Sequence, residues 1–89
     1  MNSKYPYFII TFPSVHYALK SEAILKQIHT NVRLVPVPRE ISSSCGVAAK
    51  VFESDLEIVT SNMRNNHLEF DAIYIYMTSG EKPKIVQQY

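Results

Sequence analysis

The stretch from Val35 to Gly46 reads Val-Pro-Val-Pro-Arg-Glu-Ile-Ser-Ser-Ser-Cys-Gly, and an apolar run typical of a β-strand lies on each side of it. Its two prolines restrict φ, and the only cysteine of the chain, Cys45, directly precedes one of only two glycines. One arginine and a run of small hydroxyl residues complete the stretch. The sequence therefore predicts a rigid polar connection between two strands that presents a single thiol.

The chain before this connection predicts a strand and a helix. Residues Tyr5–Phe12 are almost all β-branched or aromatic, which is typical of a strand central in its sheet. Ser14 is a suitable N-cap for a helix that continues to about His29. One face of this helix is expected to cover the sheet, with Ile24 at its flank, and consists of Val15, Ala18, Leu25 and Ile28.

Two further strands are expected on either side of the connection. Val32–Val37 has the pattern of a strand, and its Pro36 favours an edge position or the end of the strand, because proline cannot donate to a neighbouring strand. Gly46–Phe52 is assigned to a third strand by its valines, although its two alanines favour a strand less than valines do.

The C-terminal half repeats the order of helix and strand. A helix is expected from Ser54-Asp55 to about Asn66, with one apolar side made of Leu56, Val59 and Met63. Phe70–Met77 alternates isoleucines with tyrosines and predicts a fourth strand. Residues 79–83 form a turn, and Lys84–Tyr89 is either a short extra strand or a loose tail.

This element order predicts the fold. The chain of 89 residues suits one domain, residues 1–89, in which residues 79–89 are a turn followed by a short strand or a loose tail. Strand, helix, strand, strand, helix, strand is the α+β ferredoxin-like βαββαβ sandwich, a four-stranded antiparallel sheet with two helices on one face. Strand three then lies between strands one and two, so the connection Val37–Cys45 is expected to meet the turn Pro13–His16.

Composition excludes several classes of protein. The net charge is +1 with scattered Lys and Arg, which disfavours nucleic acid as a partner. No apolar run approaches the ~18 residues of a membrane helix, and the start of the chain has no signal-peptide pattern. A lone cysteine fits a reducing compartment, so a cytoplasmic protein is expected. One cysteine and three histidines without paired spacing predict no metal site, and no cofactor is expected.

Reactive thiol chemistry is the functional hypothesis for Cys45. A helix N-terminus near Ser14, the imidazole of His16 and the guanidinium of Arg39 would each favour the reactive thiolate. The hydroxyls of Ser42, Ser43 and Ser44 offer hydrogen-bond donors to an anion held there, and Gly46 follows the thiol. The alternative is that Cys45 is a small buried filler, as most lone cysteines are, and that His16 is merely an exposed residue of the first helical turn. The residues alone leave both open.

Two segments carry a resemblance to a known family. Ile10–Glu22 and Leu34–Gly46, with Pro-Arg-Glu-Ile-Ser-Ser-Ser-Cys-Gly as the specific part, resemble the small bacterial family named Putative Se/S carrier protein-like, over about Tyr7 to Tyr76. The resemblance implies that Cys45 carries selenium or sulfur as a perselenide or persulfide, with Arg39 and His16 in support. Val15 stands where the family pattern has a threonine, which removes one hydroxyl but leaves the thiol.

Three functions compete at this point. The first is a carrier, rather than a turnover enzyme, that takes the chalcogen from a cysteine desulfurase or selenocysteine lyase and passes it to an acceptor protein. The second is a small regulatory or adaptor domain that binds a metabolite or protein, with a structural Cys45. The third is a thiol-dependent redox protein, which lacks a second cysteine to resolve a mixed disulfide within the chain. A homodimer through the exposed sheet face stays open.

Overall fold

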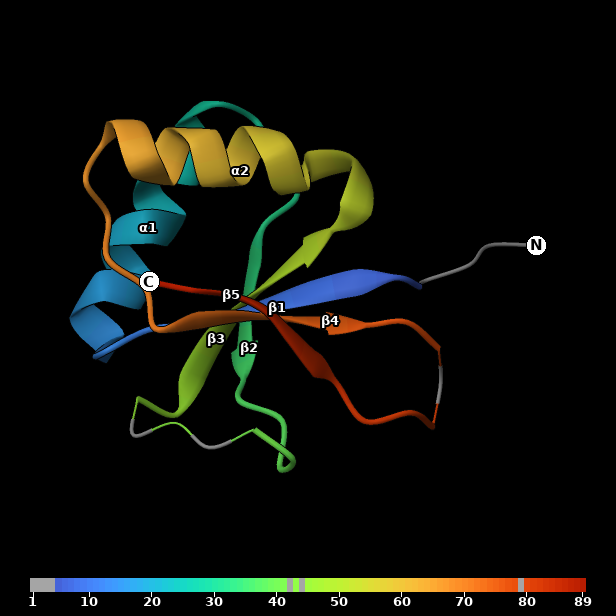
Figure 1. The fold of residues 1–89 in the computed structure, drawn as a ribbon. Coiled ribbons are helices and arrows are strands. Elements are labelled where there is room, and N and C mark those ends of the chain that lie inside the picture. Colours follow the sequence, from blue (N-terminus) through green and yellow to red (C-terminus); the bar gives the residue numbers. More distant parts are fainter. Residues whose placement is uncertain (1–4, 42, 44, 79) are drawn as a thin grey trace.

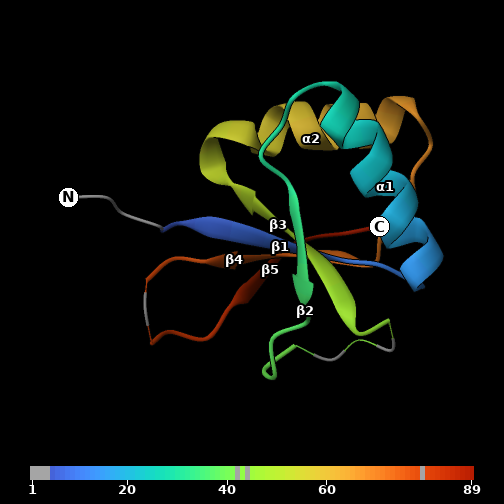
Figure 2. The ribbon, with the colours of Figure 1, turned by 180° about the vertical axis from the view of Figure 1, so that it is seen from behind.

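The computed structural model describes residues 5–41, 43, 45–78 and 80–89, so Ser42, Ser44, the residue at the start of the expected turn 79–83 and the first four residues lie outside the description. The elements in chain order are β1 (Tyr7–Thr11), α1 (Val15–Gln27), β2 (Arg33–Pro36), β3 (Val47–Phe52), α2 (Glu53–Asn65), β4 (Ala72–Tyr76) and β5 (Lys84–Gln88). Both helices lie on one side of a single twisted sheet (Figures 1 and 2). The predicted α+β class, with two helices on one face of an antiparallel sheet, is confirmed.

The sheet has one strand more than predicted. Its order is β2-β3-β1-β4-β5, and every neighbouring pair is antiparallel. The first four strands keep the predicted arrangement, with β3 between β1 and β2. The prediction of four strands is wrong because β5 pairs with the outer edge of β4, and the fold is therefore only approximately ferredoxin-like. All five residues of β5 are exposed, so backbone pairing rather than an apolar face holds this strand.

Alternation along the strands divides the core into two parts. The helix-side core lies between the sheet and the helices and includes Phe8, Ile10, Phe12, Ala49, Val51 and Ile73. The open-face cluster lies on the other surface of the sheet and contains Ile9, Ile41, Ala48 and Tyr76, with Tyr5, Tyr7, Val35, Val37 and Tyr74 packed against them. The alternation of isoleucine and tyrosine predicted for the fourth strand is thus confirmed, since β4 sends its isoleucines to one face and its tyrosines to the other.

The two helices cover the sheet with the faces predicted, apart from one residue. In α1 the side chains of Ala18 and Leu25 are buried, but Val15 in the first turn is exposed. The prediction that Val15 covers the sheet is therefore wrong, because the helix enters the fold there with its first turn facing solvent. In α2 the expected residues Val59 and Met63 are buried. Neither helix, within the described residues, is long and apolar enough to span a lipid bilayer.

Candidate functional site

The loop between β2 and β3 continues the pairing of these two strands. Pro36 lies opposite Val47, and one step further the Val37 N–H donates to the Gly46 carbonyl at 3.2 Å. Gly46 adopts a φ of +80°, a left-handed conformation that favours glycine, and nothing lies within 4 Å of the position that a Cβ would take. Backbone conformation rather than crowding therefore requires glycine after Cys45. The loop from Val37 to Gly46 is closed at its base by this hydrogen bond.

Ile41 anchors the far part of the loop. Its N–H donates to the Pro38 carbonyl at 3.0 Å, which forms a turn, and its side chain is 5% exposed within the open-face cluster. The sequence predicted a loop that is polar throughout, so this anchor was missed. A single apolar residue among polar ones has no periodicity that reveals its burial, and only the proline turn before it is a local signal.

Cys45 is held by two local hydrogen bonds among the described residues. Its N–H donates to the Ser43 hydroxyl at 3.3 Å, and its Sγ–H donates to the Val47 carbonyl at 3.3 Å. The side chain is half-buried and packs against the helix-side core. The thiol is therefore seated at the edge of the core with part of its surface in solvent, between the two extremes of a buried filler and a freely exposed nucleophile.

The fold brings the start of α1 to the same end of the sheet as Cys45. Thr11, the last residue of β1, pairs with Ala48, the second residue of β3. Figures 1 and 2 both show the first turn of α1 and the start of β3 at this end. Ser14, the N-cap residue, has an extended backbone and no side-chain capping hydrogen bond, and its carbonyl accepts from Tyr17 and Ala18 instead. The predicted meeting of the loop with the turn Pro13–His16 is thus supported at the level of the elements.

The two predicted partners of the thiol have side chains in solvent. Arg39 is exposed in the Pro38–Ile41 turn, and His16 is exposed on α1 with its ring 5.8 Å from that of Tyr17. The hydrogen bonds of Cys45 within the described part of the chain involve neither of them. Their roles toward Cys45 remain predictions. Ser42 and Ser44 lie outside the described residues, whereas Ser43 is half-buried and contacts the Cys45 backbone.

The neighbouring Glu40 faces the tyrosines of the open face. Burial raises the pKa of Tyr76, and the negative charges of Glu40 and, less so, of Tyr7 raise this pKa further. The buried Tyr76 hydroxyl has no hydrogen-bond partner of good geometry among the described residues, so Glu40 acts on it as a nearby charge. The Tyr76 ring stacks on that of Tyr7, with the two centroids 4.9 Å apart. Glu40 and Ile41 thus both tie the loop to the open face.

We searched the described part of the chain for side chains that could bind a metal ion together. No group of three or more His, Cys, Asp or Glu side chains gathers there in a way that could hold an ion. The only cysteine is a free thiol. This end of the sheet holds one half-buried sulfur beside a glycine, in a loop held by backbone hydrogen bonds and by Ile41.

Comparison with known proteins bears on this cysteine. The family model described as "Putative Se/S carrier protein-like" matches residues 7–75, which include β1 to most of β4, the loop and Cys45. The comparisons with curated proteins and with solved structures gave no match. Since the family match covers most of the chain, including the loop that holds the single thiol, the protein belongs to the Se/S carrier protein-like family.

Proposed function

We propose that the protein carries sulfur or selenium on Cys45 as a persulfide or perselenide and hands it to an acceptor protein. One observation supports this proposal most strongly. The family match includes the only cysteine of the chain, and this cysteine is a half-buried free thiol directly before Gly46, which has a positive φ. The side chain of Cys45 is only half-buried, so part of its surface stays open to a donor or acceptor protein. As a cytoplasmic carrier the protein would work with a cysteine desulfurase or selenocysteine lyase as donor.

Loading is a transfer of one sulfur or selenium atom between two thiols. The Cys45 thiolate attacks the terminal atom of the donor's persulfide or perselenide, and a bond forms between Sγ and that atom. The bond between this atom and the donor sulfur breaks, and its electron pair leaves with the donor cysteine as a thiolate. The proton of the Cys45 thiol passes to solvent, and the donor thiolate takes one up. The transferred atom keeps its oxidation level, so the step needs no oxidant.

Delivery is the same exchange in the other direction. A nucleophile of the acceptor attacks the terminal atom, and the bond to Sγ breaks with return of the Cys45 thiolate. The hydrogen bond from Sγ–H to the Val47 carbonyl is absent in the loaded form, because the added atom replaces the thiol proton. Loading therefore removes the hydrogen bond that the sulfur donates, whereas the bond from the Cys45 backbone N–H to the Ser43 hydroxyl can stay. In this proposal Arg39 and His16, which are exposed near the same end of the fold, support the anionic loaded group.

Intact mass measures the proposed reaction directly. The protein is incubated with a cysteine desulfurase and cysteine, or with a selenocysteine lyase and selenocysteine, under conditions free of oxygen. We expect a gain of one sulfur or selenium atom that a thiol reductant reverses. Cys45→Ser removes the only thiol and should abolish the gain. Ser54→Ala, which removes an exposed hydroxyl from α2, is a control that should keep it. No gain in the unaltered protein with either donor would contradict the proposal.

The packing of the Cys45 side chain against the core supports a second candidate function. Cys45 packs against the helix-side core and donates to a backbone carbonyl, as a structural cysteine does. The protein would then be an adaptor or regulatory domain that binds a partner elsewhere. Alkylation of the native protein with iodoacetamide separates the two functions. A carrier should react in the native state near pH 7, whereas a structural thiol reacts only after denaturation.

A further inference from the structure

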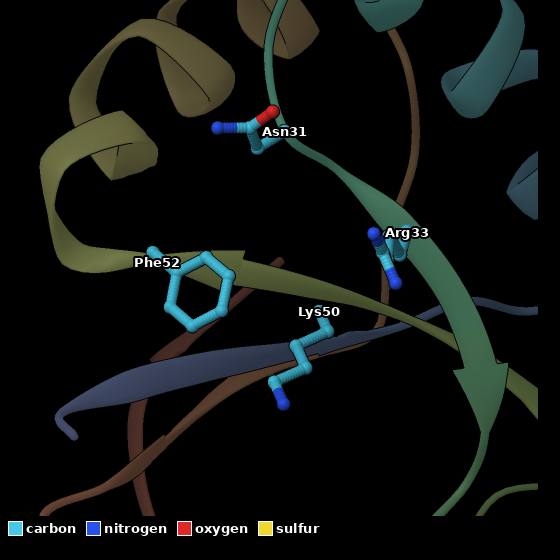
Figure 3. A pocket seen from close by; sticks show the side chains of 4 residues that line it. All are labelled: Asn31, Arg33, Lys50 and Phe52. Atoms are coloured by element: carbon cyan, nitrogen blue, oxygen red, sulfur yellow. The ribbon is translucent and has the colours of Figure 1, made fainter. Parts of the chain in front are cut away.

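The open face of the sheet carries a cavity that the carrier function does not use. Figure 3 shows four residues that line it, Asn31, Arg33, Lys50 and Phe52. The volume of the cavity is about 450 Å³. It lies where β2 begins and β3 ends, and this is the opposite end of β3 from Cys45. This volume is within the range of pockets that hold small organic ligands.

The cavity contains two cations in direct cross-strand register. Arg33 of β2 is the partner of Lys50 of β3, so the two side chains leave the same face of the sheet side by side. Like charges in this arrangement repel each other and lower the stability of a sheet. The ion pair found within the described residues joins Lys26 to Glu22 and involves neither of them. In the described part of the chain, no ion pair therefore neutralises either cation.

The remaining surroundings leave this charge available to a ligand. The Lys50 ammonium lies 4.4 Å from the centre of the Tyr7 ring and 5.5 Å from that of Phe52, which holds it over the sheet. Two acidic residues, Glu53 and Asp55, stand in the first turn of α2, directly after β3. Asp55 accepts the Asn31 backbone N–H at 3.3 Å, and neither Asp55 nor Glu53 lines the cavity. The Asn31 side chain adds an amide to the wall.

We propose that this cavity binds a phosphate monoester attached to a planar ring, the chemistry of a nucleoside monophosphate. A phosphate monoester carries a charge of about −1.5 to −2 near pH 7 and three strong acceptor oxygens, which match two adjacent cations better than a single carboxylate does. The Arg33 fork and the Lys50 ammonium donate to the phosphate oxygens. The half-buried Phe52 ring provides the apolar surface on which a planar ring lies.

This site is independent of the thiol. Its cations lie on the open face, whereas Cys45 packs against the helix-side core at the other end of β3. The site also predicts an unusual combination of effects. Removing the charge of the exposed Arg33 relieves the cross-strand repulsion and leaves the ring contacts of Lys50 in place. Arg33→Gln should therefore leave the melting temperature unchanged or raise it while it weakens ligand binding. A cation that served only folding would show the opposite.

Calorimetric titration of the full chain with adenosine 5′-monophosphate tests the proposal. Adenosine and inorganic phosphate are titrated in parallel, each at low and high NaCl. We expect saturable binding of the monophosphate that weakens with added salt, and weaker binding of either half alone. Arg33→Gln and Lys50→Gln should each weaken binding by about tenfold or more. Lys20→Gln, which removes an exposed cation from α1 on the helix side, is the matched control and should bind as the unaltered protein does.

Several results would overturn the proposal. They are the absence of saturable binding of the monophosphate, adenosine binding as tightly as its monophosphate, and unchanged affinity in Arg33→Gln. Inorganic phosphate binding as tightly as the monophosphate would remove the role of the ring, as would unchanged affinity in Phe52→Leu. Because the Cys45→Ser variant keeps the cavity, it should still bind the monophosphate, so failure of the carrier proposal and failure of this one are distinguishable.

Discussion

The two faces of the sheet differ in what they pack and in what they offer. The helix-side core is aliphatic and aromatic and is closed by α1 and α2, and Cys45 is seated at its edge. The open face carries tyrosines, two adjacent cations and a loop residue, Ile41, in place of a helix. Adjacent residues of one strand, Ile9 and Ile10, belong to different faces. The same alternation therefore builds a stable core on one side and leaves a surface for polar chemistry on the other.

Truncation of one isoleucine on each side should show this difference most strongly. Ile10 is fully buried in the helix-side core, and Ile10→Ala should lower the free energy of unfolding toward the upper end of the range of about 2–5 kcal/mol for such changes. Ile41→Ala should fall near its lower end, because the loop can partly close the space. Urea unfolding measures both, and hydrogen exchange of the Ile41 and Val37 amides should increase in Ile41→Ala alone.

A matched control for these truncations is Ile58→Ala. Ile58 lies on α2 with 46% of its surface exposed, so its loss should change the free energy of unfolding by no more than about 0.5 kcal/mol. If Ile41→Ala were no more destabilising than this control, Ile41 would not anchor the loop.

The sequence predicted the helix-side half of the fold far better than the open face. Apolar periodicity marked Ala18, Leu25, Val59 and Met63 because burial under a helix repeats along the chain. β5 remained one of two alternatives because its residues are exposed and its pairing with β4 is made by backbone groups, which any sequence supplies. Ile41 was missed because a single burial has no period. From the sequence, Cys45 and its glycine could be named as candidates for the site, and their role stays a prediction. The Arg33–Lys50 pair could not be named, because it depends on cross-strand register.

The two glycines provide a test of whether the backbone next to Cys45 positions the thiol. Alanine at Gly46 and at Gly80 should strain the backbone equally, but only Gly46 is next to Cys45. Gly46 and Gly80 have φ values of +80° and +88°, with open space around each. Substitution by alanine at either should lower the free energy of unfolding by a similar amount, about 1 kcal/mol or somewhat more, from conformation alone. Only Gly46→Ala should also slow chalcogen loading of Cys45, measured by intact mass. Equal loading in both variants would show that the Gly46 backbone does not position the thiol.

The free energy of unfolding at alkaline pH should depend on the two stacked tyrosines of the open face, Tyr7 and Tyr76. The pKa of Tyr76 is raised by burial first and by Glu40 second, and that of Tyr7 by burial first. Above the usual tyrosine pKa of about 10, the unfolded chain loses these protons before the folded chain does, so the free energy of unfolding should fall as pH rises. Tyr76→Phe should match the unaltered protein near pH 8 and lose less stability above about pH 10. Glu40→Gln should remove only the smaller part of this loss, and identical alkaline profiles for all three proteins would contradict the assignment.

Arg39 should have the smallest effect on folding and a selective effect on the carried group. Its side chain is exposed, and the ion pair found in the described part of the chain does not involve it. Arg39→Gln keeps the approximate length of the side chain and removes its charge, so the free energy of unfolding should change by no more than about 0.5 kcal/mol. A guanidinium that donates to the persulfide or perselenide anion makes a charge-assisted hydrogen bond, a class worth about 1.5–3 kcal/mol, so the loaded form should be shorter-lived or harder to make in this variant.

The conservative variant separates charge from shape at this position. Arg39→Lys keeps the positive charge but loses the planar fork of donors, so it should restore only part of the lifetime of the loaded form. The decay of the loaded mass over time, at equal loading, measures this lifetime for the unaltered protein and both variants. Lys20→Gln, which removes an exposed cation of α1, controls for the change in net charge and should leave the lifetime as it is. Unfolding of Arg39→Gln would make the residue structural, whereas unchanged loading and decay would mean that backbone groups hold the anion without it.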